Sequence, residues 1–158
     1  MTADRPLTWG PAVLFGALAL LPDADVIGFA FGVKYGDPLG HRGASHSLLA
    51  AAVVAAVAAL LCWALKRPGP LSWFLWVFAV VGSHGLLDTL TTGGKGVALL
   101  WPFSETRFFA PWRPIPVAPI GAGLLSLRGL HVMAVEALLF APFWVYALWP
   151  QRWRRRAR

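Results

Sequence analysis

The chain has 158 residues, of which 58% are hydrophobic and only 13% are charged. This composition excludes an ordinary soluble domain, because too few charged side chains remain to cover its surface, and it indicates an integral membrane protein. The formal net charge is +7, but five of the fourteen Lys and Arg side chains follow the last apolar run, in residues 151–158, which predicts a basic cytoplasmic tail attracted to anionic lipid and no nucleic-acid partner.

Four apolar runs follow one another along the chain, and a hydrocarbon core of about 30 Å needs about 20 helical residues to cross it. The first, Leu7–Leu21, is short, but no small-residue cleavage pattern follows it, so we expect an uncleaved helix and not a signal peptide. The second and third, Leu48–Leu65 and Leu71–Leu87, are joined by a tight basic turn. The fourth, Leu130–Trp149, is long enough to span, with a kink expected at Pro142.

These runs predict an all-α integral membrane protein with about four transmembrane helices, organised as a single helical membrane domain over residues 1–150. Four spans place two long loops, residues 23–45 and 91–129, on one face, and the amino terminus, the short turn and the tail on the other. Eight Lys and Arg side chains lie on the tail side and six on the loop side. This excess predicts a multi-pass protein with its tail in the cytoplasm and its long loops outside.

The unusual polar residues fall at helix ends that this topology brings to one membrane face. Two carboxylates follow the first helix, two imidazoles precede the second, a His and an Asp end the third, and a His opens the fourth. The one cysteine, Cys62, lies in an apolar run, which excludes a cysteine-rich zinc site. Oxygen and nitrogen ligands suit zinc, and also manganese or iron. The candidate ligands are Asp23, Asp25, His41, His46, His84, Asp88 and His131.

The spacing within these pairs predicts different roles. His84 and Asp88 are four residues apart, so on a helix both project from one face and suit chelation of one ion, although they could instead be hydrogen-bonded to each other. Asp23 and Asp25 flank one residue, so one of them can bind the ion while the other orients a neighbour. We expect His41 in the loop, and His46 in the first turn of the second helix.

A divalent ion at this face would make a nucleophile from water and polarise a phosphoryl or carbonyl oxygen. Arg42, and less directly Lys34, Arg107 or Arg113, would bind the anionic group of a small-molecule or lipid substrate. We assign the catalytic roles to Asp25, His46 and Arg42.

Two alternatives stay open beside hydrolysis at a metal. A metal cluster could pin the helices together without catalysis and serve as a platform for a partner. Serine hydrolysis by Ser45, Ser47 or Ser83 is disfavoured, because the chain has no G-x-S-x-G motif.

The polar motifs also carry a family resemblance. In order and spacing, over residues 18–114, they resemble the YdjM family of inner-membrane metal-dependent hydrolases. The resemblance implies a helical inner-membrane protein distantly similar to zinc-dependent phospholipase C, with a phosphoester or phospholipid-like substrate. The matching segments are LLPDAD at residues 20–25, GHRGASHSLL at 40–49, GSHGLLD at 82–88 and LLWP at 99–102.

The resemblance implies Asp23 or Asp25, and His41 or His46, as ligands, together with His84 and Asp88. It further implies a second metal site completed by His131 and Glu136, whose spacing of five differs from the HxxxE arrangement of the relatives. Members of the family commonly carry a His near the amino terminus, and residues 1–22 of this chain contain none.

Overall fold

The computed structural model describes residues 9–148, which form helices and loops without a β-strand; one isolated bridge pairs Val97 with Phe108. The contacts divide the chain into two compact units, Met1–Arg113 and Pro114–Arg158. The predicted all-α class is therefore confirmed for the described residues. The single domain predicted over residues 1–150 stays a prediction, and the basic tail lies outside the described residues.

The first unit begins with a helical rod that changes its winding partway. Helix α1 (Trp9–Leu20) continues directly into the 3-10 helix η1 (Leu21–Phe31). The change falls at Pro22, which lacks a backbone N–H and whose ring crowds the preceding turn. The rod ends at Gly32, whose φ of 84° gives the left-handed conformation common after a helix. The helical segment thus continues beyond Leu21, where the first apolar run ends, and both of its carboxylates lie on helical turns.

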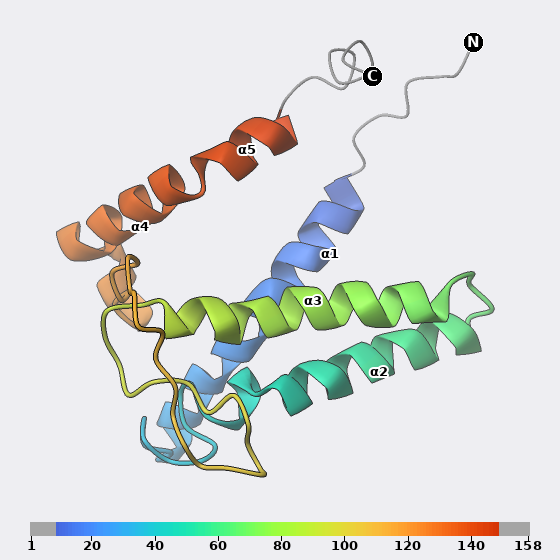
Figure 1. Ribbon diagram of the computed structural model, residues 1–158, viewed down its shortest axis with the longest axis horizontal. Helices are drawn as coiled ribbons and strands as arrows, with labels where there is room; N and C mark the ends of the chain where they lie inside the picture. The colour runs from blue at the N-terminus through green and yellow to red at the C-terminus, as the bar shows by residue number, and fades with distance from the viewer. Residues whose placement is uncertain (1–8, 149–158) are drawn as a thin grey trace. The chain divides into compact units, whose positions relative to one another are not determined.

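Helices α2 (Leu48–Ala64) and α3 (Pro70–Thr89) form an antiparallel pair (Figure 1). Ser47 caps α2 by accepting a hydrogen bond from the Ala50 N–H at 3.0 Å. Small side chains let the two helices approach closely. The buried core between them consists of Ala51, Ala55, Val77 and Val81, each at most 3% exposed.

The surface of the first unit is apolar along its helices. Trp63 and Trp76 are 68% and 65% exposed, and many aliphatic side chains of α2 and α3 are similarly open. Two helical segments, Gly10–Phe31 and Pro70–Thr89, are long and apolar enough to cross a membrane, and α2 is a shorter apolar helix. A membrane protein is therefore plausible on structural grounds, while the number of spans stays a prediction.

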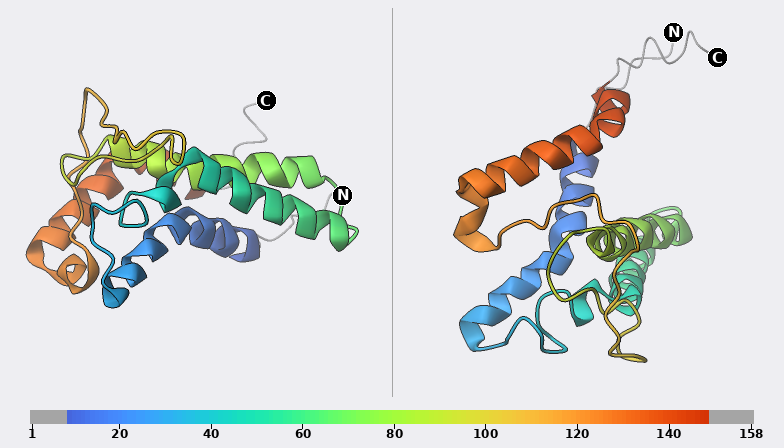
Figure 2. Two further views of the ribbon diagram at one scale, coloured as in Figure 1. Left: turned by 90° about the horizontal axis from the view of Figure 1, so that it is seen from below. Right: turned by 60° about the vertical axis from the view of Figure 1, so that its left-hand side comes forward.

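The two long connections of the first unit pack together near the site-bearing ends of η1 and α3 (Figures 1 and 2). The Ala98 N–H donates to the Arg42 carbonyl oxygen and the Leu48 N–H donates to the Leu99 carbonyl oxygen, both at 3.0 Å. Arg107 adds further bonds, because its guanidinium donates to the carbonyl oxygens of Asp37 at 3.1 Å and Arg42 at 3.2 Å. The loops are thus ordered around the polar side chains that they carry.

The second unit contains the 3-10 helix η3 (Gly121–Leu125), α4 (Leu127–Leu139) and α5 (Ala141–Leu148). A single helix was predicted over Leu130–Trp149, and the structure divides this segment at Phe140. The division lies two residues before Pro142, which cannot donate the hydrogen bond that a continuous helix requires. The predicted interruption at this proline is therefore present, as a break between two helices.

Candidate metal centre

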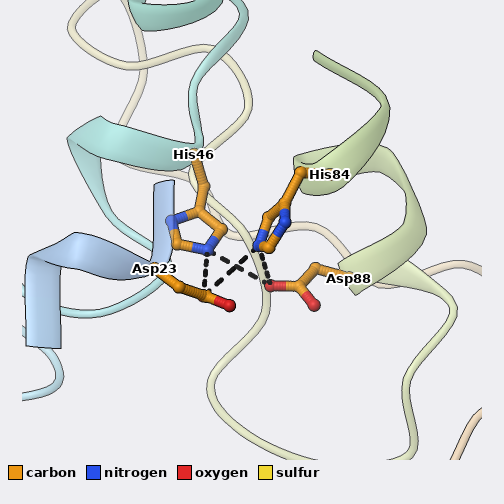
Figure 3. Close-up of side chains that lie close together, drawn as sticks. All are labelled: Asp23, His46, His84 and Asp88. Atoms are coloured by element: carbon orange, nitrogen blue, oxygen red, sulfur yellow. Dashed lines mark ion pairs between the residues drawn. The ribbon is translucent and has the colours of Figure 1, made fainter. Parts of the chain in front are cut away.

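Three elements of the first unit bring four polar side chains to one point (Figure 3). The rod η1 supplies a carboxylate, the 3-10 turn η2 (Ala44–His46) supplies an imidazole, and the last turns of α3 supply one of each. In Figure 3 the four side chains point toward one another. We refer to Asp23, His46, His84 and Asp88 as the tetrad.

The tetrad atoms are close to one another but are not hydrogen-bonded together. The Nε2 atoms of His46 and His84 each lie 3.3 Å from Asp23 Oδ1, and they lie 3.4 and 3.9 Å from Asp88 Oδ2. Both Nε2 atoms and Asp88 Oδ2 are buried without a hydrogen-bond partner among the residues that the structure describes. Buried polar atoms in proteins are normally satisfied, so this convergence needs an explanation.

The spacing of these atoms fits a tetrahedral ion. Nitrogen and oxygen ligands at about 2.0–2.1 Å from a zinc ion lie about 3.3–3.4 Å from each other at the corners of a tetrahedron. The tetrad has four distances from a His Nε2 atom to an Asp carboxylate oxygen. Three of them are 3.3 or 3.4 Å, and the fourth is 3.9 Å. The residues present therefore fit a divalent ion held by two imidazoles and two carboxylates.

Asp25 makes a second set of contacts behind the tetrad. Its Oδ1 accepts a hydrogen bond from His41 Nδ1 at 2.8 Å, and its Oδ2 accepts one from the Ser45 hydroxyl at 2.6 Å. The Ser45 oxygen lies 2.9 Å from His46 Nδ1, and Asp25 Oδ2 lies 3.2 Å from the same nitrogen. Asp25 thus connects both loop histidines, one of which belongs to the tetrad.

Arg42 holds Asp88, the second carboxylate of the tetrad. Its Nε lies 3.1 Å from Asp88 Oδ2 and its Nη2 donates to Asp88 Oδ1 at 3.1 Å, while Nη1 donates to Thr91 and Gly93. Arg42 is 4% exposed and has a φ of 62°, a conformation that is uncommon outside glycine. In the structure the guanidinium positions Asp88, and its expected contact with a substrate stays a prediction.

Gly85 explains how α3 comes close enough to the His46 turn. A Cβ atom at this position would collide with the backbone carbonyl oxygen of His46, which lies directly against the helix. At Gly82, one turn earlier, a Cβ atom would have only ordinary contacts, the nearest 3.7 Å from Ala51. His84 is thus a candidate ligand, and the neighbouring Gly85 leaves room for the His46 turn beside it.

Exposure differs sharply within the tetrad. The His46 side chain is fully buried, those of His84 and Asp88 are 15% and 17% exposed, and that of Asp23 is 43% exposed. The site is therefore enclosed by the loops and open on the Asp23 side. Burial alone would lower the pKa of His46, but the carboxylates of Asp23, Asp25 and Asp88 outweigh it and raise that pKa to about 10.

Six of the eight predicted ligands lie in this cluster, as two groups that share His46. His46 itself sits in the turn η2 just before α2, not in the first turn of that helix. The other two, His131 and Glu136, lie on α4 in the second unit, and their roles stay predictions. Among the additional basic residues proposed to bind substrate, Arg107 holds loop carbonyls and Arg113 stacks over Phe109 at 4.8 Å.

The sequence motifs predict no metal-related role for two residues of the site, Ser45 and Thr91. Ser45 was considered only as a nucleophile, and its place beside His46 in the GHRGASHSLL segment was the available signal. Thr91 accepts from Arg42 and donates to the Asp88 carbonyl oxygen, and only the fold brings these groups together.

Comparison with known proteins supports the motif resemblance over nearly the whole chain. The sequence profile of a family described as "YdjM inner membrane protein" matches residues 2–156. The chain is also similar to a protein named "Inner membrane protein YbcI" of Escherichia coli (strain K12), with 44% identity over 164 aligned residues that cover 92% of this chain and 86% of the relative. Among solved structures none matches the chain.

Proposed function

This chain belongs to the YdjM family of inner membrane proteins, and from that premise we propose that it is a membrane-bound, metal-dependent hydrolase of phosphoesters. The tetrad is the proposed metal site, and zinc is the favoured ion, ahead of manganese and iron. One observation carries the proposal: the buried Nε2 atoms of His46 and His84, which have no hydrogen-bond partner among the described residues, converge on Asp23 Oδ1 and Asp88 Oδ2. Three of the four nitrogen–oxygen distances are 3.3 or 3.4 Å, and the fourth is 3.9 Å.

The surrounding residues support a site that binds and orients. When bound, a divalent ion supplies Lewis acidity toward a phosphoryl oxygen and lowers the pKa of water. Arg42 keeps Asp88 in place through both carboxylate oxygens, and Asp25 and Ser45 fix the His46 ring from its other edge. The exposed side of Asp23 is the proposed point of entry for substrate and water.

The substrate is proposed to come from the membrane. Asp23 lies within the apolar segment Gly10–Phe31, and His84 and Asp88 lie in the last turns of the apolar helix Pro70–Thr89, so a lipid with a phosphoester headgroup can reach the site without leaving the bilayer. We further propose a multi-pass arrangement in which the tail is cytoplasmic and the site faces outside, as the distribution of positive side chains predicts.

A structural metal site is the second candidate function, and the ligand count favours it. Four protein ligands complete a tetrahedral zinc ion, which is the usual arrangement of structural sites, whereas catalytic sites keep a position for water. An ion bound by the tetrad would tie η1, the turn η2 and α3 together. For catalysis the ion must accept a fifth ligand or exchange Asp23, the ligand with the most exposed side chain.

Metal content and hydrolysis, measured on the same preparations, test both candidates. The full chain, purified in detergent or in nanodiscs, is assayed by plasma mass spectrometry and with phosphoesters that include phospholipids. We expect His84→Ala and Asp88→Ala to lose metal and activity, and Ser83→Ala, an exposed neighbour on α3, to keep both. Metal lost in both ligand variants without any wild-type hydrolysis would favour the structural role. Unchanged metal content in both would refute the site.

A further inference from the structure

We infer that the centre holds one divalent ion, and that Asp25 is a positioning residue for His46 and not a ligand of a second ion. The inference rests on the proposed metal site but concerns the group of Asp25, His41 and His46 behind it. By residue type, that group could equally be a second metal site, since it offers one carboxylate and two imidazoles.

The contacts of the two groups differ in kind. Asp25 makes short hydrogen bonds, at 2.8 Å to His41 and 2.6 Å to Ser45, which satisfy the polar atoms involved. Atoms that share a tetrahedral ion would be separated by about 3.3 Å or more. The tetrad has the opposite pattern, with longer contacts and three unsatisfied buried atoms. The tetrad therefore has the geometry of a coordination sphere, and the Asp25 group has that of a hydrogen-bond network.

The network also decides which nitrogen of His46 can bind an ion. The Ser45 hydroxyl donates its proton to Asp25, so its oxygen can only accept from His46 Nδ1, 2.9 Å away. Asp25 Oδ2, 3.2 Å from the same nitrogen, also favours a proton there. The lone pair of the neutral ring then lies on Nε2, which is buried, has no hydrogen-bond partner in the described part of the chain and is directed toward Asp23 and Asp88 of the tetrad. A second ion on Nδ1 would require both nitrogens of one ring as ligands.

The charges of the cluster also indicate a single divalent ion. Three carboxylates, Asp23, Asp25 and Asp88, face one guanidinium, Arg42, so the cluster has a net charge of minus two when its histidines are neutral. One divalent ion neutralises this charge. A second would leave two uncompensated positive charges in a site where Asp25 and Arg42 have side chains only 5% exposed, and such burial is costly.

The test is zinc stoichiometry and affinity, measured by competition with a chromophoric chelator on full-length protein. The variant is Asp25→Asn, and the matched control is Asp37→Asn, which changes a loop carboxylate that accepts only from the Lys34 N–H in the described structure. We expect one zinc ion per chain in all three proteins. We also expect an affinity about 10–100-fold weaker in Asp25→Asn alone, because the ring would lose its orienting carboxylate.

Cobalt substitution separates positioning from ligation. We expect Asp25→Asn to keep the intense visible bands of four-coordinate Co²⁺, since no ligand is removed. Two ions in the wild type would overturn the inference, and so would a folded Asp25→Asn that binds none. The wild-type count decides the ion number even if the variant does not fold. A wild-type protein that binds no ion would refute the proposed function itself. A wild-type protein that binds two ions would refute only the inference of a single ion.

Discussion

Gly85→Ala tests whether close packing of α3 against the His46 turn maintains the proposed metal site. Real Cβ atoms keep at least 3.0 Å from a carbonyl oxygen, and the added methyl group would lie well inside this limit, against the His46 oxygen. Relief requires a shift of about 0.5 Å or more, which reaches the tolerance of a preorganised site. The His46 Nε2 contacts of 3.3 and 3.4 Å would change by the same order.

We expect Gly85→Ala to cost about 1–3 kcal/mol in the free energy of unfolding, as overpacking typically does. Zinc affinity should fall at least about tenfold, which corresponds to 1.4 kcal/mol of binding free energy. Gly82→Ala is the control on the same helix, because its Cβ would meet Ala51 at 3.7 Å and Leu48 at 3.8 Å. Thermal unfolding and zinc titration of both variants measure the two quantities. Equal zinc affinity in the two would refute the packing argument.

Four further outcomes are expected. Arg42→Met should destabilise the protein by about 3–5 kcal/mol in chemical unfolding, because Asp88 loses its cationic partner in a largely buried site, and a loss below 1 kcal/mol would contradict this pairing. Zinc affinity should rise with pH between about 6.5 and 10, because the ion must displace the proton that the raised pKa of His46 retains, and a flat titration would contradict it. In the metal-free protein that protonated ring contributes stability that is complete below about pH 6.5 and is lost as the pH rises through about 10. Ser47→Ala should cost about 0.5–2 kcal/mol through loss of the α2 cap while leaving the zinc stoichiometry unchanged.

Much of the site could be predicted because membrane topology constrains helix ends. The predicted alternation of spans placed the polar ends of four helices on one face, and the structure brings the polar residues of the first three together, while the role of His131 on the fourth stays a prediction. His84 and Asp88, four apart on one helix, had to lie together. Resemblance to a family then identified the same segments. The predictions that depended on residue type and helical spacing therefore agree with the observed cluster.

The roles within the cluster were beyond the sequence because they depend on contacts between distant segments. Asp23 and Asp25 have the same side chain, so the sequence could not distinguish their roles. The winding of η1 directs the Asp23 side chain toward α3 and the Asp25 side chain toward His41. The expected contact of Arg42 with a substrate stays a prediction, but its ion pair with Asp88 could not be predicted, because a left-handed backbone conformation and the loop at residues 91–93 bring the two together. Helix boundaries differed for a local reason, since Pro22 changes the winding of its segment without ending it.

X-ray absorption at the zinc edge on the purified, zinc-loaded chain tests the central claim most directly. The account predicts a single first shell of two imidazole nitrogens and two carboxylate oxygens at about 2.0–2.2 Å, and no sulfur. His84→Ala should lose the corresponding imidazole scattering. A shell without imidazole, or a His84→Ala spectrum identical to that of the wild type, would contradict the assignment of the tetrad as the metal site.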